Sequence, residues 1–148
     1  MSAHLLDANL LIALAWPQHV HHAKAHEWFA KVGRSAWATC PLTELAFIRI
    51  SSNPKIIPEA VTPREALTML MKIVGLPGHH FWSDEVRPTK AATFDSLALV
   101  GHRQVTDAYL LALAQYHKGK LATLDGGVVE LIKDQNERGR SVVVVDGR

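Results

Sequence analysis

The stretch Leu5-Leu6-Asp7-Ala8-Asn9-Leu10-Leu11 decides the fold, because it joins a short apolar strand to an apolar helix through a single acidic residue. A brief, continuous apolar run is typical of a strand that is buried on both faces. The helix continues to Ala15 and is stopped by Pro17, since proline lacks the backbone N–H that a helix interior needs. A buried strand followed at once by a helix is the unit from which parallel sheets are built.

The same alternation of strand and helix recurs along the rest of the chain. We predict further strands at residues 36–39, 80–82, 121–124 and 142–145, and further helices at 21–31, 41–52, 63–74, 94–99 and 105–117. Thr62, Pro63 and Glu65 form a helix-start pattern of N-cap, first-turn proline and capping acid. Together these elements predict an α/β fold, a three-layer α/β/α sandwich with a central parallel sheet.

Composition sets limits on the kind of protein. The 148 residues are 48% hydrophobic and 20% charged, which predicts one globular domain spanning 1–148. Cys40 is the only cysteine, so an internal disulfide is excluded and a reducing compartment fits. We find no signal peptide and no apolar run near the roughly 20 residues of a membrane span. We therefore predict a cytoplasmic protein without a membrane segment.

Four acidic residues occupy positions that a purely solvated surface role does not explain. Asp7 and Asp125 end predicted strands, and Glu44 and Asp107 lie near the starts of predicted helices. In parallel sheets, ligands bind beyond the carboxyl ends of the strands, so we expect these side chains to converge there. Carboxylates are rarely buried unpaired, and a shared hard cation such as Mg²⁺ or Mn²⁺ takes oxygen ligands.

We hypothesise that Asp7, Glu44 and Asp107 hold one metal ion, and that Asp125 completes the site or holds a second ion. Two cations about 3.5–4 Å apart can clamp the attacking and leaving oxygens of a phosphoryl displacement. The competing interpretation is that each acid is a helix cap, a turn residue or a partner of a helix dipole.

Other polar residues near these acids are weaker candidates. Asn9 and Thr106 are predicted to orient a water or a carboxylate by hydrogen bonding, and Asp95 is a weak candidate for the same site. His19, His22 and His26 have spacings that place them on one helix face. A zinc site would need a fourth ligand, so we expect a solvated or dimer-facing surface instead.

His79 and His80, at the start of a predicted strand, are interpreted as structural.

Four segments, in this order, resemble the motifs of PIN-domain ribonucleases: Leu5-Leu6-Asp7-Ala8-Asn9-Leu10-Leu11, Leu42-Thr43-Glu44-Leu45, Val105-Thr106-Asp107-Ala108-Tyr109-Leu110 and Ala122-Thr123-Leu124-Asp125. The chain length and motif order most resemble the VapC toxins of prokaryotic toxin–antitoxin pairs. Each motif is weak alone, whereas the ordered set of four is specific.

The resemblance implies a parallel α/β/α sandwich, usually a homodimer, that works as a Mg²⁺- or Mn²⁺-dependent endoribonuclease. Such proteins cut tRNA or rRNA at exposed single-stranded loops and so stop translation. A VapB antitoxin fills the active-site groove in a heterotetramer or larger complex, and DNA is bound only through the antitoxin. When the family's metal site is transferred to this sequence by its motifs, its ligands would be Asp7, Glu44, Asp107 and Asp125. Gly126-Gly127 departs from relatives that carry a larger or basic residue there.

Arg103 lies about one helical turn before Asp107. It can pair with that carboxylate or contact an RNA phosphate, and both interpretations stay open.

Three alternatives compete with a ribonuclease toxin. A haloacid-dehalogenase-type phosphatase needs a second carboxylate two residues after the first, where this chain has Asn9. A response-regulator receiver needs a paired acid near the first strand, and here Asp7 stands alone. A catalytically silent PIN domain that serves only as an antitoxin partner in a repressor complex would keep the same acids.

Overall fold

The computed structural model describes residues 2–90, 93–94, 97–99 and 101–145. These residues form a five-stranded sheet of order β3-β2-β1-β4-β5, and every neighbouring pair of strands is parallel. The strands are β1 (His4–Leu6), β2 (Trp37–Thr39), β3 (His79–Phe81), β4 (Lys120–Thr123) and β5 (Val142–Val144). The strand predicted at 80–82 therefore begins and ends one residue earlier.

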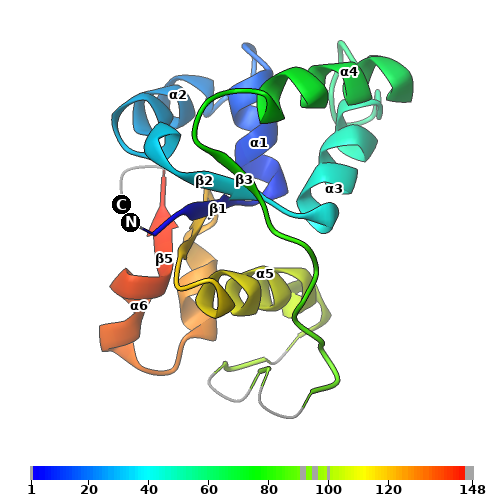
Figure 1. Ribbon diagram of the computed structural model, residues 1–148. Coiled ribbons are helices and arrows are strands. Elements are labelled where there is room, and N and C mark those ends of the chain that lie inside the picture. Colours follow the sequence, from blue (N-terminus) through cyan, green and yellow to red (C-terminus); the bar gives the residue numbers. More distant parts are fainter. Residues whose placement is uncertain (1, 91–92, 95–96, 100, 146–148) are drawn as a thin grey trace.

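Helices cover both faces of the sheet, which confirms the predicted three-layer sandwich (Figure 1). One layer holds α1 (Ala8–Ala15), α2 (His22–Lys31), α3 (Pro41–Ser51) and α4 (Pro63–Val74). The other holds α5 (Val105–Tyr116) and α6 (Gln135–Ser141). Short 3₁₀ turns occupy Gly33–Ser35, His102–Gln104 and Gly126–Leu131.

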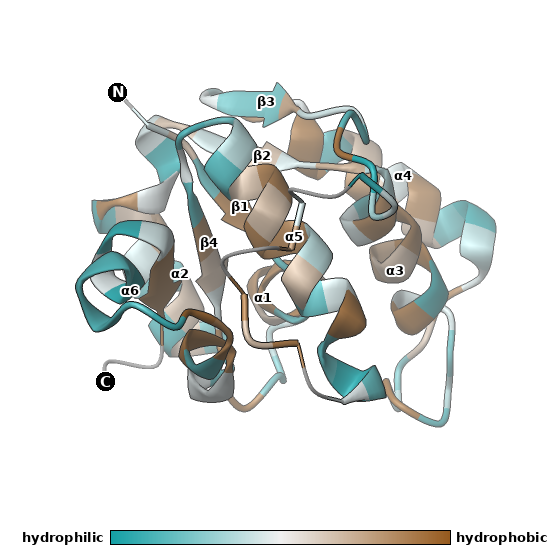
Figure 2. Cartoon of the chain, turned by 90° about the horizontal axis from the view of Figure 1, so that it is seen from below, coloured by the Kyte–Doolittle hydropathy of each residue, from teal (hydrophilic) through white to brown (hydrophobic). Residues whose placement is uncertain are grey.

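Each face of the sheet has its own apolar core. Leu5 packs into the core beneath α5, and Leu6 packs into the core beneath α1, because successive strand residues point to opposite faces. Figure 2 shows the contrast between the two helices of the second layer: α5 is largely apolar, whereas α6 is hydrophilic. All residues of α5 from Ala108 to Ala114 are buried, so this helix is an internal element that holds the residues at its start in place.

Helix ends account for several polar residues. The predicted capping box of α4 is confirmed, because the Thr62 and Glu65 side chains each accept the other residue's backbone N–H. At the end of α1, the ring nitrogens of His22 and His26 lie 2.7 and 3.0 Å from the carbonyl oxygens of Ala13 and Leu14. These two histidines therefore bind the last carbonyls of α1, which lack helical partners. Sequence reasoning had not foreseen that role.

The helix predicted at 94–99 is wrong for the residues that are described there. Phe94 lies in a turn, and Leu97 forms an isolated antiparallel bridge with Ile132. The Ala98 N–H donates to the Leu131 carbonyl at 2.7 Å. Backbone pairing with a distant segment thus replaces the local helix that the apolar pattern indicated.

Within the described ranges, no helix has both the length and the apolar content needed to cross a bilayer.

Candidate active site

Three neighbouring strands bring the four acids to one edge of the sheet. In the order β2-β1-β4, Asp7 directly follows β1, and Asp125 comes two residues after β4. Glu44 lies in the first turn of α3, which follows β2, and Asp107 lies in the first turn of α5. All four therefore lie on the side where strands end and helices begin, and there the helix dipoles favour negative charge.

Asp7 is the buried acid of this edge, with 7% of its surface exposed. Its Oδ1 accepts the Leu10 N–H at 2.9 Å and so caps α1. The alternative interpretation of this acid as a helix cap is therefore confirmed for Asp7. Burial raises the Asp7 pKa to about 6, against hydrogen bonds from Thr123 and Leu10 that lower it. The charges of Asp107 and Asp125 raise the Asp7 pKa further, so these three carboxylates repel one another.

Asp107 and Asp125 complete this electrostatic group. Asp107 is half-buried, and its pKa is raised first by burial and then by the charge of Asp125. Asp125 is exposed, and its Oδ1 accepts the Gly127 N–H at 2.8 Å, as expected of a turn residue. The Asp125 N–H donates to the Thr123 hydroxyl oxygen at 3.0 Å. Asp125 thus has a local structural partner in addition to the charges of its neighbours.

Glu44 is held by a residue of β2, which lies on the side of β1 opposite to β4. Its Oε2 accepts the Thr39 hydroxyl proton at 2.7 Å, and the Thr39 oxygen also lies 2.7 Å from Nε2 of His79. Burial lowers the pKa of His79, an effect that the Glu44 charge opposes and that His80 adds to. Glu44 and His79 therefore interact electrostatically through the intervening threonine.

The donor set fits a hard divalent cation in charge and chemistry. It consists of carboxylate oxygens, and no ion pair links any of the four acids to a lysine, arginine or histidine of the described residues. Among those same residues, however, no three His, Cys, Asp or Glu side chains lie close enough together to hold a metal ion as they stand. Joint coordination by the four acids would therefore require their side chains to move closer together.

The weaker candidates have less contact with the acids. Asn9 and Thr106 are exposed in the first turns of α1 and α5, and neither hydrogen-bonds to any of the four acids in the part of the chain that is described. Arg103 is exposed in the 3₁₀ turn before α5 and makes no ion pair with Asp107, although both residues are described. Asp95 lies outside the described residues.

Sequence reasoning missed two threonines that contact the acids. Thr39 and Thr123 are fully buried last residues of β2 and β4, on either side of β1. Thr39 donates to Glu44, and Thr123 hydrogen-bonds to Asp7. A hydroxyl at the end of an apolar strand was the available signal, because a buried hydroxyl needs a hydrogen-bond partner.

A groove of about 480 Å³ borders the acidic edge. Leu42 of α3 and Val105, Thr106 and Tyr109 of α5 line it together with Arg87 of the preceding loop. The groove therefore reaches the first turns of both helices that carry Glu44 and Asp107.

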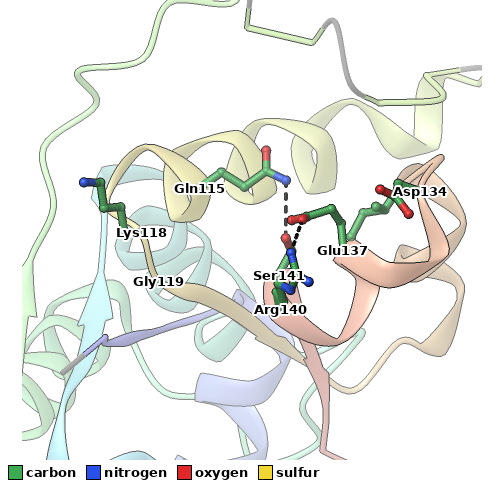
Figure 3. A pocket seen from close by; sticks show the side chains of 8 residues that line it. Gln115, Lys118, Gly119, Asp134, Glu137, Arg140 and Ser141 are labelled. Atoms are coloured by element: carbon green, nitrogen blue, oxygen red, sulfur yellow. Dashed lines mark hydrogen bonds and ion pairs between the residues drawn. The ribbon is translucent and has the colours of Figure 1, made fainter.

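A second cavity, of about 410 Å³, lies at the other end of the strands (Figure 3). Gly119 and Ser141 in its lining immediately precede β4 and β5. Its lining charges include an ion pair between Arg140 and Glu137 at 2.7 Å. Because ligands of open parallel sheets bind at the carboxyl ends of the strands, the acidic edge is the better candidate.

Comparison with known proteins assigns the family. The sequence model of the PIN domain matches residues 4–133. The chain therefore belongs to the PIN-domain family. It is 44% identical over 131 residues to Ribonuclease VapC38 of Mycobacterium tuberculosis (strain ATCC 25618 / H37Rv), covering 88% of this chain and 91% of that protein.

Two other relatives agree. Ribonuclease VapC39 of the same strain is 44% identical over 126 residues, covering 85% of this chain and 91% of that protein. Ribonuclease VapC29 of that strain is 38% identical over 130 residues, covering 88% and 91%. The predicted resemblance to VapC-type PIN-domain ribonucleases is confirmed.

Proposed function

We propose that this protein is a metal-dependent endoribonuclease that acts as the toxin of a VapBC-type toxin–antitoxin pair. It hydrolyses phosphodiester bonds of RNA, in exposed loops of tRNA or rRNA, and so inhibits translation. The observation that carries the proposal is the gathering of Asp7, Asp107 and Asp125 at one edge, where the charges of Asp107 and Asp125 oppose the ionisation of Asp7 and the charge of Asp125 opposes that of Asp107. Clusters of carboxylates with raised pKa values are typical of functional sites. The similarity to the VapC ribonucleases supports the same reaction.

Asp7, Glu44 and Asp107 would hold one Mg²⁺ or Mn²⁺, and Asp125 would complete the site or hold a second ion. When bound, such a metal supplies Lewis-acid polarisation of the phosphate and an activated water. The chain's own part is to fix the ligands. The Leu10 N–H and the Thr123 hydroxyl fix Asp7, and the Thr39 hydroxyl fixes Glu44. Asn9 and Thr106 remain candidates for orienting a water.

The partners follow from the same proposal. RNA would approach along the groove that contains Thr106 and Arg87, with the exposed Arg103 as a further phosphate contact. We also propose that residues 1–148 form one PIN domain that works in the cytoplasm as a homodimer. A VapB antitoxin would join it in a heterotetramer or larger complex and would supply all contacts to DNA.

The test is cleavage of total cellular RNA by purified, antitoxin-free protein with Mg²⁺, with Mn²⁺ and with EDTA. We expect a few discrete cuts that need a metal and that the Asp7→Asn variant does not make. Asp134→Asn is the matched control, because Asp134 also caps a helix but is exposed and lines the cavity at the amino ends of the strands. Cleavage retained by a folded Asp7→Asn protein would refute the metal-site assignment. No cleavage by folded wild-type protein would favour the silent PIN domain in an autorepressor complex.

A further inference from the structure

A chain of three side chains joins the edge strand β3 to the acid on α3. Nε2 of His79 lies 2.7 Å from the Thr39 hydroxyl oxygen, and that oxygen lies 2.7 Å from Oε2 of Glu44. The residues come from β3, β2 and α3, so the contact depends on the tertiary fold. The O···O distance is typical of a hydroxyl hydrogen bond, and the N···O distance lies at the short end of its range.

The direction of these bonds follows from the protons available. A hydroxyl carries one proton, and an ionised carboxylate can only accept, so the Thr39 proton points to Glu44. The Thr39 oxygen must then accept from His79, which places a proton on Nε2 of that ring. A hydroxyl that accepts a hydrogen bond becomes a stronger donor. The bond from His79 therefore strengthens the hydrogen bond that Thr39 donates to Glu44.

His79 itself is held in place. Its ring centroid lies 4.7 Å from that of Trp37 with the rings inclined by 60°, and Trp37 is fully buried. The Trp37 Nε1–H donates to the Pro77 carbonyl at 3.2 Å, and Trp37 pairs with His79 in the β2–β3 register. The next residue, His80, is exposed and points to the opposite side of the strand, so it makes a natural control.

We propose that His79 is a positioning residue, which acts through Thr39 to fix the Glu44 carboxylate in the orientation that metal binding requires. This inference rests on the proposed function, in which Glu44 is a metal ligand. A glutamate on a helix surface has several rotamers, and a metal gains affinity when its ligand is already fixed. Within the described residues, the Glu44 side chain is hydrogen-bonded through Oε2, and no such bond occupies Oε1.

The experiment measures Mn²⁺ binding to the purified full-length chain by isothermal titration calorimetry. His79→Phe keeps an aromatic ring against Trp37 but removes the donor, and Thr39→Val removes the hydroxyl. We expect each to weaken Mn²⁺ binding by roughly 10- to 100-fold, the range for partners that orient metal ligands. His79→Gln and Thr39→Ser restore a donor and should recover most of the affinity. His80→Phe should bind Mn²⁺ as the wild type does.

A double variant separates this role from a general structural one. If His79 acts through Thr39, then His79→Phe combined with Thr39→Val should bind Mn²⁺ no more weakly than Thr39→Val alone. In RNA cleavage, the Mn²⁺ concentration for half-maximal rate should rise while the rate at saturating Mn²⁺ changes little. Circular dichroism and thermal melting check folding. If His79→Phe does not fold, His79→Gln compared with Thr39→Val tests the donor at position 79, and wild-type Mn²⁺ affinity in Thr39→Val would overturn any role of His79 that acts through Thr39.

The outcomes distinguish the two proposals. Wild-type Mn²⁺ affinity in His79→Phe, or additive losses in the double variant, would overturn the role of His79. If Glu44→Gln binds Mn²⁺ weakly in the same experiment, the metal site stands and only the positioning role fails. If Glu44→Gln and Asp7→Asn both bind Mn²⁺ as the wild type does, the proposed metal site itself is wrong.

Discussion

The two ends of the parallel sheet handle charge in opposite ways. At the amino ends of the strands, Arg140 and Glu137 form an ion pair at 2.7 Å in the lining of a cavity. At the carboxyl ends, Asp7 and Asp107 have raised pKa values, and Asp125 adds to both shifts. Charge is therefore neutralised locally at one end and concentrated at the other. Concentrated like charge opposes folding, and clusters of carboxylates with raised pKa values are typical of functional sites, which supports the proposed site at the carboxyl end.

The largest effect should come from removing the most buried charge of the acidic end. Asp7→Asn keeps a side-chain oxygen that can cap α1 but removes a proposed metal ligand. We expect RNA cleavage to fall by more than the roughly 100-fold that marks the upper range for indirect partners of a metal. Initial cleavage rates of the variant, the wild type and Asp134→Asn would measure this. Equal losses of cleavage rate in Asp7→Asn and Asp134→Asn would show that the two ends of the sheet do not differ in their importance for cleavage.

The same variant should stabilise the metal-free fold at neutral pH. The Asp7 pKa rises from 3.8 to about 6 on folding, so ionisation of Asp7 disfavours the folded state. The penalty is absent below about pH 4, grows as the pH rises, and is fully present above about pH 6, where it reaches about 3 kcal/mol.

Urea unfolding in EDTA at pH 4 and pH 7 tests this. The free energy of unfolding of Asp7→Asn should exceed that of the wild type at pH 7, and the gap should close at pH 4. A gap that is independent of pH would mean that Asp7 carries no such penalty.

A divalent cation should remove this repulsion. A ligand that binds only the folded state at 100 times its dissociation constant stabilises it by about 2.7 kcal/mol. We expect Mn²⁺ to raise the melting temperature of the wild type, as followed by circular dichroism against an EDTA reference. Asp7→Asn should show a much smaller shift. Equal shifts in both proteins would place the cation elsewhere.

The smallest effect should come from the amino end of the strands. Arg140→Gln breaks an ion pair whose arginine side chain is 73% exposed, and exposed pairs contribute roughly 0–1 kcal/mol. The free energy of unfolding should therefore change by less than about 1 kcal/mol, and RNA cleavage should keep its wild-type rate. A clear loss of cleavage would show that this end also takes part in the reaction.

The sequence was informative where local pattern and tertiary structure agree. The apolar run Leu5-Leu6 and the start pattern Thr62-Pro63 identified β1 and α4, because strand burial and helix capping produce patterns in residues that are adjacent in the sequence. The parallel sheet with helices on both faces followed from the alternation of such elements. That all four acids serve one metal ion stays a prediction.

The pattern failed where distant segments decide the structure. The apolar residues at 94–99 suggested a helix, yet Leu97 pairs with Ile132. The charged stretch after Asp134 did not suggest a helix, yet α6 forms there, capped by that residue. Short elements such as these depend on contacts made by the rest of the fold more than on their own propensity.

The sequence by itself determined the order of the five strands and of most helices and put an acid near the end or start of four of these elements, because periodicity and side-chain chemistry are local properties. Only the tertiary structure decided which side chains meet. It buried Asp7 beside the charges of Asp107 and Asp125. It also brought His79 to Thr39, 40 positions earlier in the chain. A hydrogen bond depends on distance and angle in space, which the spacing of residues along a chain does not specify.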